Sequence, residues 1–300
     1  MADTPVLLVG AGPVGPLLAA ALVHNGARLT WVVRSAQRRA ELAKLRLVIG
    51  DERLELDMAG TDISPTLPPE RVAEASWLVL AVKAQHVMPL LDSLQPLPEQ
   101  GVLVVANGLH EGPFHLGVLY GGARLEDGAV VSTTANRLYV GALGGVTPRA
   151  EDLPPLLSAP WLSVEDCPRV EERMWRKLAV NCVVNPLTAL LDCPNGALLD
   201  CLDSPLALGL LREAYRVGRI AAPGAFSGGL VELTEELVSL IRSTAQNSSS
   251  MREDLRAGRE PEIAMLNLAV AKHGARLGLS LPLNVMIGHM VSLAANRGAL

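Results

Sequence analysis

The sequence predicts an α/β protein of two domains, a doubly wound parallel sheet followed by an all-helical part. Length is the first observation, because 300 residues exceed what one ordinary core holds. In the first half of the chain, short apolar runs alternate with helix-like segments, which is typical of parallel strands joined by helices. In the second half, apolar residues recur at helical spacing.

The elements of the first half follow from local patterns. Strands are expected where short apolar runs stand between breakers: residues 5–9, 28–33, 77–82 and 102–106. Helices are expected between them: residues 14–25, 36–44 and 86–94. Gly26 is placed to cap the first helix. Two further apolar segments flank Gly50-Asp51-Glu52, which predicts a hairpin.

From residue 170 onward the pattern predicts helices: residues 170–191, 205–221, 230–246, 260–277 and 282–295. Pro186 lies inside the first of them. Because a proline disfavours helical geometry at the residue before it, we expect a kink or an interruption there. Prolines accumulate between residues 148 and 168, so we place the domain boundary near Cys167, with domains 1–167 and 168–300.

Composition and charge exclude several classes of function. The net charge is −5 and no dense run of Lys and Arg occurs, which argues against a nucleic-acid partner. The four cysteines show no metal-ligand spacing, so we expect neither a zinc site nor a disulfide framework. The start of the chain lacks a signal-peptide pattern, and its longest apolar run is far below the roughly 20 residues of a membrane span. We expect a soluble, cytoplasmic protein without a membrane or metal partner, either monomer or homodimer.

A glycine-rich turn follows the first expected strand and opens the first expected helix. Its residues are Gly10, Ala11, Gly12, Pro13, Val14 and Gly15, a G-x-G-x-x-G pattern. The first glycine permits a tight turn, the second lets the backbone approach a pyrophosphate, and the third lets helix and strand pack closely. The same pattern can be a purely structural turn. Its place between strand and helix favours a dinucleotide site of the Rossmann type, with these six residues as cofactor contacts.

The residues after the second expected strand predict which dinucleotide binds. NAD sites usually carry an acidic residue there for the ribose 2′-hydroxyl, whereas this chain reads Val32-Val33-Arg34-Ser35. Arg34 can pair with a 2′-phosphate, so we predict NADP(H), although a surface arginine would look the same. Lys83 and Asn107 end two further expected strands, where they would meet cofactor or substrate or be ordinary loop residues.

Three polar residues share one face of the first helix in the second half. Lys177, Asn181 and Asn185 are spaced by four residues on an otherwise apolar helix. Burying them without partners would be costly, so we expect them to face a cavity or a polar partner. Cys182 has no neighbouring base and is interpreted as a packed thiol.

The segment around these residues resembles the signature of the ketopantoate reductases (2-dehydropantoate 2-reductases). It reads W-R-K-L-A-V-N-C-V-V-N-P-L-T-A from Trp175 and continues to Asp192-Cys193-Pro194-Asn195-Gly196. A second similar block is Gln246-Asn247-Ser248-Ser249-Ser250-Met251, followed by Asp254-Leu255 and Pro261-Glu262-Ile263. With the glycine turn, Arg34, Lys83 and Asn107-Gly108, the matches span nearly the whole chain.

The resemblance implies reduction of ketopantoate by NADPH, in pantothenate and coenzyme A synthesis. It implies an NADP-binding first domain and a catalytic second domain similar to the C-terminal domain of 6-phosphogluconate dehydrogenase. Lys177 matches the general acid and Glu262 a glutamate that positions substrate and lysine. The other roles it implies are substrate binding by Asn181, Asn185 and Ser250, contact with both ligands by Asn107, and cofactor binding by Gly10, Gly12, Gly15, Arg34 and Lys83. Taken alone, Lys177 could be a surface lysine, Glu262 a helix start and Ser250 a helix cap.

Two departures from the family pattern leave the substrate open. His110 follows Asn107-Gly108-Leu109 and would narrow the pocket, unless it is merely structural. The region 133–145 is shorter than in the family. One alternative is therefore a related NADPH-dependent reductase of another small 2-keto acid. A second is a non-catalytic NADP-binding sensor, against which the intact Lys177, Asn181, Ser250 and Glu262 argue.

Overall fold

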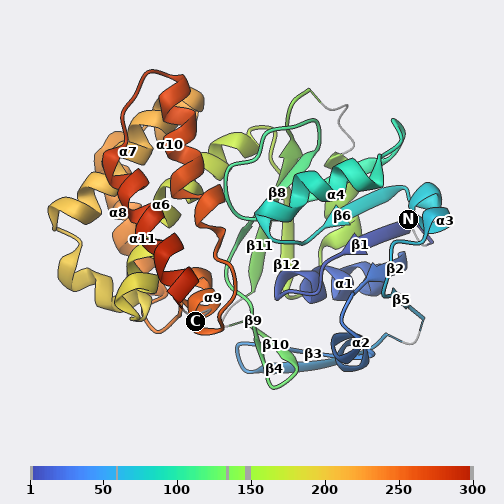
Figure 1. Cartoon of the computed structure of the whole chain (residues 1–300). Helices are drawn as coiled ribbons and strands as arrows, with labels where there is room; N and C mark the ends of the chain where they lie inside the picture. Colours follow the sequence, from blue (N-terminus) through green and yellow to red (C-terminus); the bar gives the residue numbers. More distant parts are fainter. Residues whose placement is uncertain (1–2, 59, 133–134, 146–149, 298–300) are drawn as a thin grey trace. The chain divides into compact units, whose positions relative to one another are not determined.

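The computed structural model describes residues 3–58, 60–132, 135–145 and 150–297. The chain divides into two compact units, the first of residues 1–106 and 111–170, the second of residues 107–110 and 171–300. Figure 1 shows the strands of the first unit in blue and green and the helices of the second in yellow to red. Part of the region predicted to be shortened, residues 133–134, lies outside the described ranges.

The first unit is built on an eight-stranded sheet in the order β12-β11-β8-β7-β6-β1-β2-β5. The strands are β1 (Pro5–Val9), β2 (Arg28–Val32), β5 (Asp62–Ser64), β6 (Trp77–Leu80), β7 (Gly101–Val104), β8 (His115–Tyr120), β11 (Asn136–Ala142) and β12 (Leu162–Asp166). Pairing is parallel from β5 to β8; β11 runs antiparallel to β8 and parallel to β12. The predicted doubly wound parallel sheet is confirmed.

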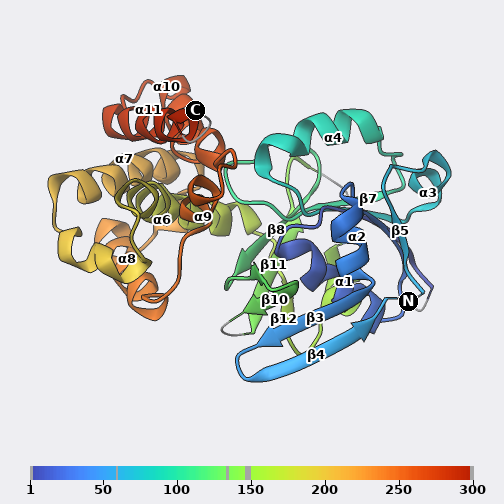
Figure 2. The same cartoon turned by 60° about the horizontal axis from the view of Figure 1, so that its bottom comes forward.

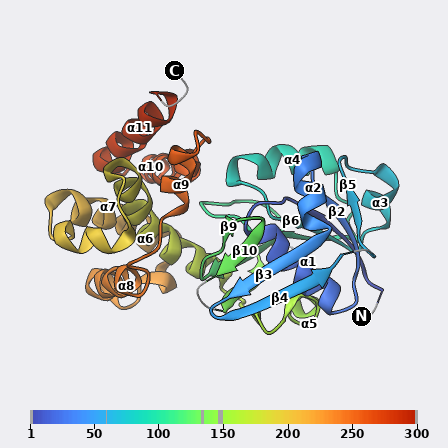
Figure 3. The same ribbon diagram turned by 90° about the horizontal axis from the view of Figure 1, so that it is seen from below.

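Helices cover both faces of this sheet. The chain moves in one direction along the sheet from β1 to β2 and in the other from β6 to β7, and right-handed connections in opposite directions place their helices on opposite faces. They are α1 (Val14–His24), α2 (Ala36–Leu42), α3 (Pro69–Glu74), α4 (Val87–Leu94) and α5 (Leu153–Leu157). Figure 3 shows α3 and α4 on one side of the strands and α1 and α5 on the other. Every residue of α1 from Gly15 to Leu22 is buried, as expected for an apolar helix against a sheet.

A second, four-stranded sheet has the order β4-β3-β10-β9. Its strands are β3 (Lys44–Ile49), β4 (Glu52–Asp57), β9 (Arg124–Glu126) and β10 (Ala129–Ser132). The predicted hairpin is confirmed, since Ile49 pairs with Glu52 across a two-residue turn (Figure 2). The sequence did not predict β9 and β10. β9 is exposed along its whole length, so it lacks the apolar alternation that marks a strand, and β10 finds its parallel partner in the distant β3.

The second unit is helical in all its described elements. Its α-helices are α6 (Val170–Leu191), α7 (Pro205–Ala221), α8 (Gly229–Ser243), α9 (Ser250–Arg256), α10 (Asn267–Arg276) and α11 (Pro282–Arg297). Short 3₁₀ turns complete the chain, η1 (Ala84–His86) and η2 (Ala150–Asp152) in the first unit, and η3 (Asn195–Cys201), η4 (Pro223–Phe226) and η5 (Glu262–Met265) in the second. The bounds of α6 and α7 are as predicted. The helix predicted at 260–277 is instead split at Leu266, whose φ of −105° and ψ of −104° are not helical.

Of the kink or interruption expected in α6 at Pro186, the interruption does not occur, and a neighbouring side chain explains why. The helix runs through Pro186 to Leu191. Because proline has no N–H, the carbonyl of Cys182, one turn earlier, loses its helical donor. Nδ2 of Asn267 donates to that carbonyl oxygen at 2.8 Å. A buried side chain thus supplies the hydrogen bond that the proline removes, and the helix continues.

Other expectations concern cysteines, metals and membranes. All four cysteines are free thiols. Cys182 is fully buried, which raises its pKa, as expected for a packed thiol. Within the described ranges, no cluster of His, Cys, Asp or Glu is arranged to hold a metal ion. Across those same ranges, every helix is too short or too polar to span a bilayer.

Candidate functional site

The glycine turn between β1 and α1 has the geometry that its pattern predicts. Gly10 has a φ of +120°, and a Cβ there would lie 2.1 Å from the carbonyl oxygen of Ala81. A Cβ at Gly15 would lie 2.2 Å from the carbonyl oxygen of Gly10, which also accepts a hydrogen bond from Nε1 of Trp31 at 2.8 Å. A Cβ at Gly12 would meet nothing within 4 Å. Two glycines therefore serve close packing, while the middle one borders open space, as a pyrophosphate contact requires.

The start of helix α1 adds a second favourable feature to this turn. Pro13 precedes Val14, the first residue of α1, and no side chain caps this end of the helix. Pro13 and Pro16 have no N–H, so the backbone N–H groups of Val14 and Gly15 are those left without intrahelical acceptors at this end of the helix. Free N–H groups and the positive end of the helix dipole favour a bound phosphate.

Arg34 is exposed two residues after the end of β2, with no carboxylate beside it in the sequence. Nη1 of Arg39 donates to its carbonyl oxygen at 3.1 Å, which ties this loop to α2. Sequence reasoning missed Arg38, whose Nε lies 3.4 Å from the carbonyl oxygen of Ala11 and whose Nη1 forms an ion pair of 2.8 Å with Glu41. The arginine side chain of α2 thus contacts the glycine turn, a contact that no local pattern signals. Lys83 is partly buried, three residues after the end of β6.

Lys177 and Asn107 meet in the second unit, although 70 residues separate them. Nζ of Lys177 donates to Oδ1 of Asn107 at 2.8 Å. Burial lowers the pKa of Lys177 from its ordinary value to about 8, and the negative charge of Glu262 opposes that shift. The structure therefore brings together three of the predicted site residues, an ammonium, a carboxylate and an amide. An ammonium with a pKa near neutrality is suited to proton donation.

The loop that presents Asn107 is fixed by contacts with η5. The backbone N–H of Leu109 donates to the carbonyl oxygen of Met265 at 2.9 Å. Gly108 has a φ of +100°, and a Cβ there would lie 2.7 Å from the same oxygen, so only glycine fits. These contacts explain why residues 107–110 belong to the second unit, whereas the sequence places them in a first domain of residues 1–167.

His110 is buried and holds the loop from the other side. Its Nε2 donates to the carbonyl oxygen of Asn107 at 2.9 Å, and its backbone N–H contacts Sδ of Met174 at 3.4 Å. These contacts agree with the structural reading of this histidine. Its predicted effect on the width of the pocket stays a prediction.

Asn181 and Asn185 follow Lys177 at successive turns of α6. Asn185 is 7% exposed and Asn181 is partly buried. Among the residues that the structure describes, neither carboxamide has a hydrogen-bond partner. Because buried amides are normally paired, these two groups are available to a polar ligand. Their role as substrate contacts remains a proposal.

Ser250 is exposed as the first residue of α9, and the residue before it makes the buried contacts. Oγ of Ser249 caps α9 by accepting from the backbone N–H of Arg252 at 3.2 Å. The same oxygen lies 2.7 Å from Oγ1 of Thr188 on α6. Sequence reasoning missed Ser249, because a run of three serines does not reveal which one caps the helix. A role for Ser250 towards substrate stays a prediction.

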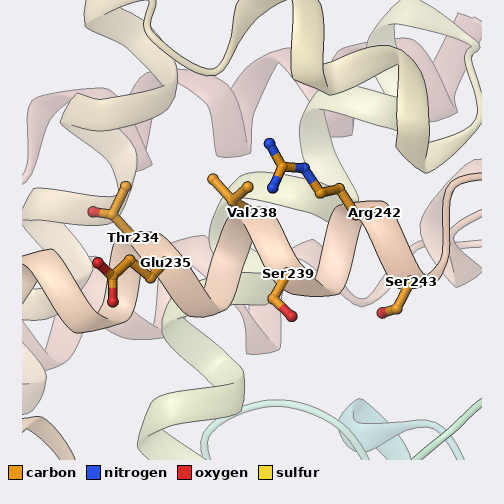
Figure 4. Close-up of a pocket in the computed structure, with 6 residues that line it drawn as sticks. All are labelled: Thr234, Glu235, Val238, Ser239, Arg242 and Ser243. Carbon is orange, nitrogen blue, oxygen red and sulfur yellow. The ribbon is translucent and has the colours of Figure 1, made fainter.

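A surface hollow on α8 is separate from these residues. Figure 4 shows the side chains that line it, Thr234, Glu235, Val238, Ser239, Arg242 and Ser243. All six come from one helix, and none is a candidate site residue. The hollow therefore adds nothing to the chemistry of the Lys177 cluster.

Comparison with known proteins places both halves of the chain. The family model "Ketopantoate reductase PanE/ApbA" matches residues 6–145, and "Ketopantoate reductase PanE/ApbA C terminal" matches residues 169–295. The 2-dehydropantoate 2-reductase of Vibrio cholerae is 28% identical over 292 residues, covering 93% of this chain and 94% of the relative.

Solved structures share the fold at lower identity. A PanE/ApbA family ketopantoate reductase from Ralstonia eutropha has a TM-score of 0.82 at 22% identity and covers 98% of this chain and all of its own. D-mandelate dehydrogenase in a ternary structure with NADH and anilino(oxo)acetate has a TM-score of 0.83 at 18% identity, with 98% and 100% covered. At these identities the likeness establishes the fold.

Proposed function

The chain belongs to the ketopantoate reductase family, and on that premise we propose that it reduces the 2-keto group of ketopantoate with NADPH, using Lys177 as general acid. The observation that carries this proposal is the contact between Nζ of Lys177 and Oδ1 of Asn107 at 2.8 Å, with a pKa of about 8. It gives the lysine a fixed position and makes its proton available near neutral pH.

The residues present fit the proposed cofactor. An added Cβ at Gly12 would meet nothing within 4 Å, which supports a pyrophosphate beside it, and Arg34 is exposed where a 2′-phosphate is expected. NADPH, when bound, supplies the hydride. We assign Gly10, Ala11, Gly12, Pro13, Val14 and Gly15 to the pyrophosphate side and Arg34 and Lys83 to the adenosine side.

The side chains of the second unit supply the proton and hold it in place. As hydride adds to the keto carbon, the electron pair of the C=O bond moves to oxygen, where negative charge develops. The ammonium of Lys177 stabilises this charge and donates a proton to it, which yields the 2-hydroxy acid. Asn107 holds Nζ, and the carboxylate of Glu262 favours the protonated lysine against the effect of burial. Asn181, Asn185 and Ser250 are proposed to bind the hydroxyl and carboxylate of the substrate.

Activity should fall as pH rises through about 8, the pKa of Lys177. A general acid works only while protonated, so kcat/KM is full below this pKa and is lost above it. The measurement is kcat/KM for ketopantoate across the pH range at saturating NADPH. In Glu262→Gln the descending limb should move to lower pH, because the charge that raises the pKa is gone. A limb that stays constant in Glu262→Gln would contradict the assignment.

Replacing Arg34 by alanine should weaken NADPH binding and leave NADH binding little changed. A lost ion pair with a phosphate costs about 1.5–3 kcal/mol, which corresponds to roughly 10–150-fold in the Kd of NADPH. Titration of the intrinsic protein fluorescence with both dinucleotides gives the two Kd values. Arg53→Ala, at an exposed arginine of β4, removes the same charge and serves as control. Equal losses for both dinucleotides would show that Arg34 does not contact the 2′-phosphate.

A second candidate is the reduction of another small 2-keto acid. It is favoured by the D-mandelate dehydrogenases, which share this fold and bind NADH, and by His110 in the Asn107 loop. Oxidation of NADPH and of NADH, followed by absorbance with a panel of 2-keto acids, separates the candidates. Selective turnover of ketopantoate with NADPH supports the first. Faster turnover of another 2-keto acid supports the second, and dinucleotide binding without any turnover would revive a sensor.

A further inference from the structure

The carboxamide of Asn267 is fully buried and joins helices of the second unit. Its Nδ2 donates to the carbonyl oxygen of Cys182 on α6 at 2.8 Å and to Oδ1 of Asn284 on α11 at 2.9 Å. Nδ2 of Asn284 in turn donates to Oε2 of Glu213 on α7 at 2.9 Å. Both hydrogens of the Asn267 amide are used, so the position of this side chain against α6 is fixed.

The acceptor on α6 lacks its helical donor because of a proline. In a regular helix the carbonyl of Cys182 would be taken by the N–H of residue 186, but Pro186 has none. Without Asn267 this buried carbonyl would be unpaired, at a cost of about 1–3 kcal/mol. Pro186 and Asn267 therefore form a pair, in which the proline frees a rigid acceptor and the asparagine anchors α10 to it.

Asn267 is also the first residue of α10, directly after the turn η5. That turn carries Glu262, whose charge acts on Lys177, and Met265, whose carbonyl holds the Asn107 loop through Leu109. Anchoring α10 thus anchors the turn before it.

The contacts form a closed ring that begins and ends on α6. From the carbonyl of Cys182 they run through Asn267 to η5, then through the loop to Asn107, and back to Nζ of Lys177. Cys182 and Lys177 are five residues apart on the same helix, which is the rigid member of the ring. The position of η5 against this helix decides how close its carboxylate comes to the lysine.

We propose that Asn267 is a positioning residue for the reaction: it holds η5 against the carbonyl that Pro186 frees, and so sets the separation between the carboxylate of Glu262 and the ammonium of Lys177. This inference rests on the proposed function of Lys177 as general acid. A purely structural role would require only that the carbonyl be paired, by whatever donor.

Four proteins distinguish positioning from simple pairing: the natural chain, Asn267→Leu, Pro186→Ala and the double variant. Leucine is close to asparagine in size but donates no hydrogen bond. Pro186→Ala supplies an N–H to the carbonyl of Cys182, so it repairs α6 without restoring the link to α10. Each protein is measured for unfolding temperature, Kd of NADPH, and kcat/KM for ketopantoate across pH, as a double-mutant cycle.

In Asn267→Leu we expect kcat/KM to fall about 10-fold or more, because displacement of reacting groups by about 1 Å can cost about 100-fold. The descending limb near pH 8 should move to lower pH, because Glu262 then opposes the effect of burial less strongly. The Kd of NADPH should not change. The double variant should regain much of the unfolding temperature lost in Asn267→Leu. Its kcat/KM should stay low, and the descending limb of its pH profile should stay at lower pH.

The proposal is overturned if the double variant recovers kcat/KM and the natural pH profile together with the unfolding temperature. A hydrogen-bond donor to the carbonyl of Cys182 would then suffice, whatever its source. An unchanged limb in a folded Asn267→Leu would overturn it as well. If that variant does not fold, Asn267→Ala, which adds no bulk, takes its place in the cycle. Full activity of Lys177→Met would instead remove the proposed function of the lysine. If the double variant has the kcat/KM and pH profile of the natural chain while Lys177→Met is inactive, only the role of Asn267 is overturned.

Discussion

Lys177→Met lowers kcat for ketopantoate reduction by about 10²–10⁴-fold, the range expected when a general acid is removed. Methionine keeps the length and the apolar contacts of the lysine stem but supplies neither charge nor proton. Oδ1 of Asn107 loses its hydrogen-bond donor, the Nζ that lies 2.8 Å away in the natural chain. The developing oxyanion loses the ammonium that stabilises it. The Kd of NADPH should change little, because an interaction made in the transition state affects kcat more than ground-state binding.

Steady-state kinetics and dinucleotide titration on the same preparations check this expectation. Lys272→Met is the matched control, because Lys272 is exposed on α10 and its replacement removes the same charge from the same unit. If the Kd of NADPH rises in Lys177→Met by the same factor by which kcat falls, the lysine acts in cofactor binding rather than in proton transfer.

Gly10→Ala should destabilise the first unit by about 2–5 kcal/mol, since it combines backbone strain with overpacking against a backbone atom. At a φ of +120° alanine is disfavoured, and its Cβ would lie 2.1 Å from the carbonyl oxygen of Ala81, far inside van der Waals contact. The adjacent ends of β1 and β6 must separate to admit it. Urea unfolding followed by circular dichroism measures the loss.

Gly12→Ala is the counterpart that separates folding from binding. Its Cβ meets nothing within 4 Å, so the free energy of unfolding should stay within about 1 kcal/mol of the natural chain. The added methyl group would occupy space proposed for the pyrophosphate, so the Kd values of NADPH and NADH should both rise. Unimpaired binding of both dinucleotides by Gly12→Ala would place the pyrophosphate elsewhere.

Long helices and buried parallel strands could be predicted from sequence because their patterns are local. α6 and α7 have their predicted bounds, since each combines a long helical pattern with clear ends, Ser204 capping α7 through its contact with the N–H of Ala207. β9 could not be found, because three exposed residues carry no burial pattern, and its pairing depends on β10.

Sequence alone could name candidate site residues but not the contacts between them. Resemblance over the Lys177 block identified the lysine, and the structure adds its hydrogen bond to Asn107 and the charge of Glu262. No spacing rule reveals a contact across 70 residues, because it is set by how η5 and the loop pack. The sequence could not decide between a kink and an interruption of α6 at Pro186 for the same reason, since the missing donor comes from Asn267, far along the chain.

The assignment of residues 107–110 to the helical unit has a consequence for gene engineering and for evolution. The chain leaves the first unit after Ala106, returns to it at Glu111 and leaves it again after Val170. A chimaera joined near residue 170 would take Lys177 from one parent and Asn107 from the other. Such a recombinant inherits the donor and the acceptor of one hydrogen bond from different parents. Exchange of the first unit between relatives should therefore succeed only when residues 107–110 are kept with the helical unit, which requires a second, internal crossover.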